Sequence, residues 1–226
     1  MDMPGFYTDP QGRVRPIRGK GTSYVVAGAL ALGVVGSSGG VASIGGGAGG
    51  AAPAGGGTSS TQLRARKSDG QKAARKGDAN AAWQRMGLRQ LRRTARQQAE
   101  CLAVSFGEVR EFFTRTRCTS LERVLFAVTD GAGNVAAVSV VWVELPSDGD
   151  ARKFHTLMDR HGSGDIRPLG SAVLGLADIQ FTGLRYGSDR DGKRVTAAEA
   201  ENATGNGFDH ETLDAIAEVA AYLPPV

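Results

Sequence analysis

The side chains that most often perform hydrolytic or metal chemistry are few in this chain of 226 residues, and their spacing does not suit that chemistry. His161, Ser163 and Asp165 supply the residue types of a hydrolase triad. Neighbours within one turn, however, cannot in general place a base on the nucleophile and an acid behind that base. The other histidines, His155 and His210, do not complete a closed zinc site, because three histidines without cysteine ligands are too few. The sequence therefore predicts no catalytic residue, no metal ligand and no cofactor.

Residues 189–192, Asp-Arg-Asp-Gly, resemble part of a calcium-binding loop. If Gly192 stands at the loop's central glycine position, Gly187 and Ala198 fall at the two outer ligand positions. Neither residue offers the side-chain oxygen that those positions require. A glycine-containing hairpin turn is therefore the prediction for this segment.

Positive charge is concentrated in one segment of the chain. Residues 64–100 contain eleven Lys and Arg against three Asp and Glu, whereas residues 101–226 contain twelve against eighteen. A run of basic residues is usually a solvated face. Outside the cytoplasm it could also bind anionic lipid headgroups or phosphate-bearing wall polymers. The side chains assigned to such anionic contacts are Arg85, Arg89, Arg92, Arg93 and Arg96. Nucleic acid would be bound by the same charges, and it is disfavoured because the segment is expected to be exported.

The chain has two cysteines, Cys101 and Cys118. In the cytoplasm they would remain thiols, whereas in an oxidising compartment a single pair is a natural disulfide. The compartment therefore decides their role.

A group of apolar residues offers a weaker functional signal than a motif would. Trp142, Val173, Leu174 and Leu176 form a partner or dimer surface if they are exposed. In the alternative interpretation they simply complete the core.

The N-terminal segment predicts export. Four basic residues at 13–20 precede a stretch from 21 to 63 that contains no charged residue. Residues 1–22 are therefore assigned to a cytoplasmic basic N-terminus and residues 23–44 to a transmembrane anchor or signal segment. Its length suits a bilayer span of about 20 residues. Its dense apolar part, at 24–35, also suits a signal peptide with small residues for cleavage near 40–42 or 52–54. The positive charges next to the segment lie on its N-terminal side, which places the rest of the chain outside the cytoplasm.

Patterns further along predict a linker and then one folded unit. Residues 45–78 are a Gly/Ala-rich and basic linker, and residues 79–226 form an extracytoplasmic α+β domain. Leu88, Leu91 and Ala95 recur at helical spacing, which predicts a basic stalk helix from residue 79 to about 102. Later patterns predict a helix at 106–114, strands at 121–129 and 135–145, a helix at 148–160 capped by Asp148, strands at 178–186 and 193–201, and a final helix capped by Asp209.

Two hairpins and several helices predict an α+β fold. The expected architecture is a two-layer sandwich, with a four-stranded, mainly antiparallel sheet and helices packed on one of its faces. The membrane-targeting helix and the basic stalk helix precede it.

Several blocks of sequence also resemble a group of uncharacterised actinobacterial membrane-anchored or secreted proteins. The blocks that carry the resemblance are residues 82–88 (AWQRMGL), 99–101, 106–110, Cys118, 125–128, 140–143 and 159–162. The resemblance covers roughly residues 79–225. It implies export, an N-terminal anchor and a bridge between Cys101 and Cys118, and it implies no activity.

The sequence thus favours a membrane-anchored envelope protein with an extracytoplasmic interaction domain and no evident catalysis. The expected partners are the membrane, another envelope protein or a second copy of the chain, and anionic lipid or wall polymer. The alternative is a secreted or anchored domain that binds or converts a small molecule in a pocket between the sheet and its helices.

Overall fold

The computed structural model describes residues 59–98, 100–170, 174–176, 179–204 and 207–226, together with the backbone of residues 6–8 and 14–16. The two N-terminal pieces are strands β1 (Phe6–Thr8) and β2 (Val14–Pro16), which pair antiparallel. The predicted targeting segment at 23–44 and residues 45–58 of the predicted linker lie outside the described residues. Among the helices that are described, none combines the length and the apolar character needed to cross a bilayer.

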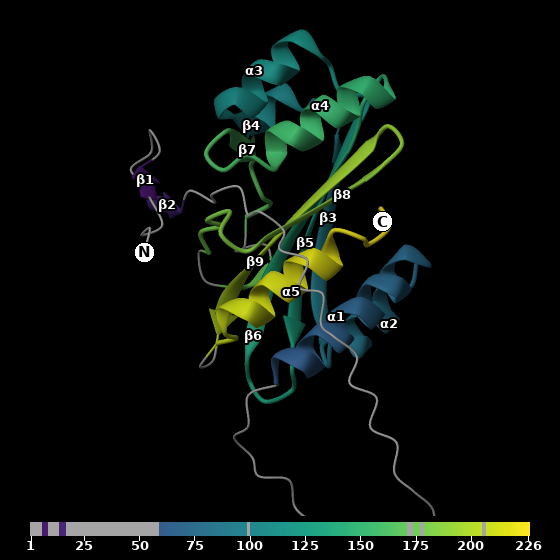
Figure 1. The fold of residues 1–226 in the computed structure, drawn as a ribbon, viewed down its shortest axis with the longest axis vertical. Coiled ribbons are helices and arrows are strands. Elements are labelled where there is room, and N and C mark those ends of the chain that lie inside the picture. Colours follow the sequence, from purple (N-terminus) through teal and green to yellow (C-terminus); the bar gives the residue numbers. More distant parts are fainter. Residues whose placement is uncertain are drawn as a thin grey trace, which may run out of the picture.

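A five-stranded antiparallel sheet forms the centre of the domain (Figure 1). The strands, in their order across the sheet, are β3 (Arg89–Gln98), β5 (Ser120–Thr129), β6 (Val135–Glu144), β9 (Arg194–Thr204) and β8 (Tyr186–Asp191). The α+β class and the two hairpins are confirmed, and β6 is the central strand. The expected number of four strands is wrong, because the arginine-rich segment forms a fifth strand, β3.

Helices cover both faces of this sheet. Helices α3 and α4 lie together at one end of the molecule (Figure 1). One face carries α1 (Ser60–Arg75), α2 (Ala79–Arg85) and α5 (His210–Ala220), and the other carries α3 (Gly107–Arg115) and α4 (Asp148–Met158). Successive side chains of a strand point to opposite faces. Accordingly Val124 and Phe126 of β5 pack with the first set of helices, whereas Leu121 packs with the second. The predicted two-layer sandwich is therefore wrong, and the domain has three layers.

The predicted stalk helix over 79–102 is also wrong, because α2 ends after two turns. Gly87 has a φ of 77°, in the left-handed region that favours glycine. The N–H of Gly87 donates to the carbonyl of Gln84, and that of Leu88 donates to the carbonyl of Trp83. These two bonds are the Schellman ending of a helix. The chain then leaves as an edge strand beside β5, with Leu91 at a bulge and 43% exposed.

Helix α1 occupies residues that the sequence assigned to the linker. Its N-terminus is capped by Ser59, whose side chain accepts a hydrogen bond from the N–H of Gln62. It packs through small residues: a Cβ atom on Gly70 would lie 3.1 Å from Cγ2 of Val219 and 3.3 Å from the carbonyl oxygen of Ala82. Because so few large apolar side chains are involved, the helix leaves little periodicity in the sequence. The first and last helices of the domain, α1 and α5, thus lie against each other.

Two local details differ from the sequence interpretation. The N-terminus of α4 is capped by Ser147, one residue before the expected Asp148, whereas the expected cap of α5 by Asp209 is confirmed. The second hairpin turns at Gly192 and Lys193, so most of the Asp-Arg-Asp-Gly segment belongs to β8. The prediction of a hairpin here is confirmed, with its first strand starting later than expected.

The face under α3 and α4 holds two separate apolar clusters. The first contains Val109 and Phe113 of α3, Phe154 of α4 and the buried Cys101. Beside it run the short helical turn η1 (Leu102–Val104) and two small strands that pair antiparallel, β4 (Ser105–Phe106) and β7 (Gly164–Ile166). The second cluster forms where Leu174 covers Leu125 and Ala127 of β5. Polar side chains occupy the space along the sheet between these clusters.

Candidate functional site

The arginines singled out in the sequence are exposed, and four of them lie on β3, at an edge of the sheet. By register, Arg92 lies opposite Ala127 and Arg96 opposite Arg123, whereas Arg93 lies opposite Phe126. Since facing residues share a face, the β3 arginines project from both faces of the edge. The remaining one, Arg85, is exposed at the end of α2. We call the four side chains on β3 the arginine edge: Arg89, Arg92, Arg93 and Arg96.

A buried guanidinium lies directly behind this edge. Arg123 of β5 is only 6% exposed, and it donates to the carbonyl oxygen of Arg167 at 2.6 Å and to Oε1 of Gln98 at 3.1 Å. Its Nε has no hydrogen-bond partner, and no carboxylate of a described residue pairs with it. Burial and, to a smaller extent, the charge of Arg96 lower the pKa of Arg123. The region behind the arginine edge therefore carries positive charge that the described residues do not neutralise.

A shallow depression adjoins the arginine edge. It has a volume of about 460 Å³ and lies between the turn that joins α1 to α2 and strand β3. Lys76 and Arg93 supply its cations and Asp78 its carboxylate, and that carboxylate accepts the hydrogen bond that caps α2. An anionic group can approach β3 here without displacing a core side chain.

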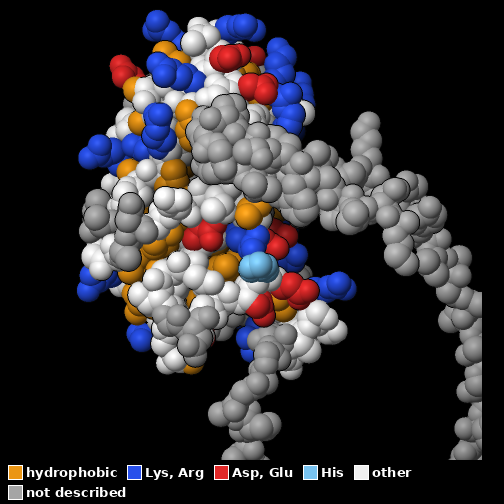
Figure 2. All heavy atoms as spheres, turned by 90° about the vertical axis from the view of Figure 1, so that its left-hand side faces the viewer, with side chains coloured by type: hydrophobic (Ala, Val, Ile, Leu, Met, Phe, Trp, Pro, Cys, Tyr) orange, Lys and Arg blue, Asp and Glu red, His pale blue; other side chains and the backbone are white. Residues whose placement is uncertain are grey.

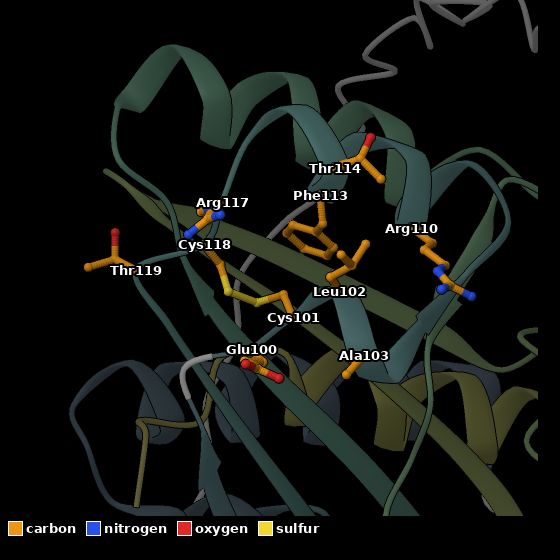
Figure 3. A pocket seen from close by; sticks show the side chains of 10 residues that line it. All are labelled: Glu100, Cys101, Leu102, Ala103, Arg110, Phe113, Thr114, Arg117, Cys118 and Thr119. Carbon is orange, nitrogen blue, oxygen red and sulfur yellow. A yellow bond between two sulfur atoms is a disulfide. The ribbon is translucent and has the colours of Figure 1, made fainter.

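A larger cavity, of about 700 Å³, lies beside the disulfide. The bridge between Cys101 and Cys118 is present, as expected for an oxidising compartment, and its Cα atoms are 6.2 Å apart. On the side of the molecule drawn in Figure 2, Lys and Arg side chains crowd the end of the domain that carries α3 and α4. Figure 3 shows Leu102 and Phe113 in the middle of the cavity wall, with Arg110 and Arg117 toward opposite sides.

A pair of carboxyl groups lies between the two apolar clusters. Glu199 of β9 is 7% exposed and hydrogen-bonded to the side chain of Asp165, and its Oε2 accepts from the N–H of Gly183 at 2.5 Å. Burial first, and then the neighbouring charge of Asp165, raise the pKa of Glu199 well above its usual value. Two carboxyl groups so close hold one proton between them. The pair joins β7 to β9.

The triad residue types are not brought together as a catalytic group. The hydroxyl of Ser163 donates to the carbonyl oxygen of Leu157 at 2.8 Å, so it helps to end α4. His155 contacts Ser188 across 3.0 Å, and His210 is the first residue of α5. Within the described ranges, no three His, Cys, Asp or Glu side chains could hold a metal ion.

Of the apolar group that could have formed a partner surface, Trp142 and Leu174 are buried and Leu176 is partly buried. Trp142 is buried and its Nε1 donates to the carbonyl oxygen of Leu223 at 2.8 Å, so it closes the α5 face of the sheet. Leu174 is buried over β5, and Leu176 packs against the same cluster. Val173 lies outside the described residues. For Trp142, Leu174 and Leu176, the burial agrees with the alternative interpretation, in which these side chains complete the core.

Arg123, Glu199 and the cavity beside the disulfide were not singled out from the sequence. Arg123 and Glu199 stand in alternating apolar strands, and this pattern break was their only signal. The cavity is lined by residues on either side of α3, and the bridge joins these two segments. Compared with known proteins, the chain matches no family model, no curated protein and no solved structure.

Proposed function

We propose that this chain is a non-catalytic envelope protein, held at the membrane through residues 23–44, whose extracytoplasmic domain binds a phosphate-bearing anionic surface along the arginine edge. The observation that carries the proposal is the combination of four exposed arginines on an edge strand with the buried, uncompensated charge of Arg123 behind them. Anionic lipid headgroups and wall polymers present such phosphates outside the membrane.

The edge position supports binding to a surface of opposite charge. Outside β3 no further described strand pairs with the sheet, and the four arginines are exposed, although Arg92 also donates to the carbonyl oxygen of Leu174 at 3.0 Å. A second copy of the chain pairing along β3 would bring the arginines of both copies together, and charged side chains on an edge strand oppose such pairing. A partner rich in phosphate meets no such penalty, and it would offset the charge of Arg123.

The disulfide supports the proposed location of the domain outside the cytoplasm. Cystine bridges persist in oxidising environments and are rare in reducing ones. The bridge joins residues that lie 17 apart in the chain, with Cys101 buried and Cys118 partly buried. Export through the predicted segment at 23–44 would place the domain where the bridge forms.

Replacing Arg93 and Arg96 together by glutamine should weaken binding to phosphatidylglycerol vesicles about 30-fold, because each base near an anionic surface is worth about 1 kcal/mol. Neither side chain makes a hydrogen bond with a described residue, so folding should be unchanged. Co-sedimentation of the folded part of the chain, residues 59–226, with vesicles at several salt concentrations measures the change. Polyphosphate in place of vesicles distinguishes a wall-type polymer from a lipid surface.

The matched control removes the same charge elsewhere. Arg115 and Lys153 are exposed on α3 and α4, and Arg115→Gln with Lys153→Gln should bind like the wild type. Equal loss in both variants would mean that net charge alone drives binding, and binding that is insensitive to salt would contradict a phosphate partner. Either result would overturn the assignment to the arginine edge.

A further inference from the structure

The cavity beside the disulfide is a second site, separate from the arginine edge. Its volume of about 700 Å³ lies within the range of about 300–1,000 Å³ typical of small-molecule sites. One wall comes from residues 100–103 and the other from α3 and the segment 117–119 that follows it. We infer that this cavity binds a small anionic amphiphile, a molecule with an apolar body and a carboxylate or phosphate group.

The apolar body is suggested by the side chains in the middle of the wall. Leu102 is 38% exposed, one of the few large apolar side chains among the described residues that face solvent to this extent. Phe113 forms the floor and belongs to the apolar cluster under α3. Leaving such a side chain in water is unfavourable, by roughly 25 cal/mol for each Å² of apolar surface. An apolar ligand that covers Leu102 and Phe113 would remove that surface from water.

The anionic group is suggested by the charges at the rim. Arg110 and Arg117 are exposed, and neither forms an ion pair with a described residue. Two other arginines at this end of the domain are paired, Arg152 with Asp148 and Arg160 with Glu108. Among the described residues that line the cavity, Glu100 is the only carboxylate, so this rim has an excess of positive charge. Guanidinium groups bind carboxylate and phosphate through paired hydrogen bonds.

The disulfide makes the site dependent on the redox state. Cys101 precedes the wall formed by Leu102 and Ala103, and Cys118 lies between Arg117 and Thr119 in the facing wall. Reduction frees the two walls from each other without removing any lining side chain. Binding should therefore require the oxidised protein.

The test uses the fluorescent fatty acid cis-parinaric acid as probe, with its uncharged methyl ester for comparison. The oxidised wild-type domain should bind the acid at least tenfold more tightly than the ester, and reduction should weaken this binding. Arg110→Gln with Arg117→Gln should weaken binding of the acid at least tenfold, whereas Arg115→Gln with Lys153→Gln should not. Displacement by laurate or by dodecyl phosphate identifies the head group.

A second variant, Leu102→Glu, tests the site independently in case the double arginine variant is poorly folded. Leu102→Glu places a negative charge on an exposed position of the wall, so it should abolish binding while leaving the circular dichroism spectrum unchanged. Equal affinity for acid and ester, or unchanged binding of the acid in Leu102→Glu, would overturn the inference. Vesicle binding through the arginine edge should be unaffected by Leu102→Glu, so the two sites are tested independently.

Discussion

Replacing Cys101 and Cys118 together by alanine is expected to lower the free energy of unfolding by about 3 kcal/mol. The bridge closes a loop with a sequence separation of 17, and constraining a loop of this length in the unfolded chain is worth roughly that amount. Cys101 is also 2% exposed and packs in the cluster with Val109 and Phe113, so its loss removes contacts as well. Urea unfolding followed by circular dichroism measures the difference.

The control is the wild-type domain in reductant, which loses the bridge but keeps both sulfur atoms in the core. It should lie between the oxidised wild type and the alanine variant in stability. Hydrogen exchange should localise the loss to residues 100–119, because the bridge joins η1 to the segment after α3. Equal urea midpoints for oxidised and reduced protein would show that the bridge does not stabilise the fold.

Glu199→Gln is expected to stabilise the domain at pH 7 and to leave it nearly unchanged at pH 4. The pKa of Glu199 is raised in the folded state, so between its unfolded and folded pKa values the folded state holds more protons than the unfolded one. The contribution of Glu199 to stability therefore falls as pH rises through that window, by up to about 1.4 kcal/mol per pH unit. Glutamine resembles the protonated acid: it can accept from the N–H of Gly183 and donate to Asp165.

The measurement is urea unfolding of both proteins between pH 4 and pH 8. Glu201→Gln serves as the control, because Glu201 is on the same strand and accepts hydrogen bonds from Thr182, yet it is only partly buried. That variant should keep the downward slope of the wild type. Parallel pH profiles for Glu199→Gln and the wild type would contradict the shared proton between Glu199 and Asp165.

Local signals in the sequence predicted the elements whose stability is decided locally. The first hairpin turns where Asp130 accepts hydrogen bonds from the N–H groups of Ala132 and Asn134, a pattern visible in the residue types. The cap of α5 by Asp209 is of the same kind. By contrast, the apolar spacing of Leu88, Leu91 and Ala95 favoured a helix. The Schellman ending at Gly87 and the free edge of β5 overrode that preference.

The site residues were predictable only in part, because their properties depend on contacts between distant segments. The exposure of the arginines on residues 85–96 was expected, although their place on a strand was not. The charge of Arg123 is uncompensated because of what lies around it after folding, chiefly Gln98 and the carbonyl of Arg167. In the same way Glu199 meets Asp165 only after β7 is placed beside the sheet.

The packing of α1 against α5 fixes when the domain can form during synthesis. The two helices are the first and last of the domain, and an ion pair of 2.5 Å between Lys67 and Glu218 joins them. The indole of Trp142, in the middle of the sheet, finds its acceptor only at Leu223. The core therefore closes only when segments from both ends of the described domain are brought together. Under the proposed export, this requirement would keep the chain unfolded while it is threaded through a translocon, and folding would follow on the far side.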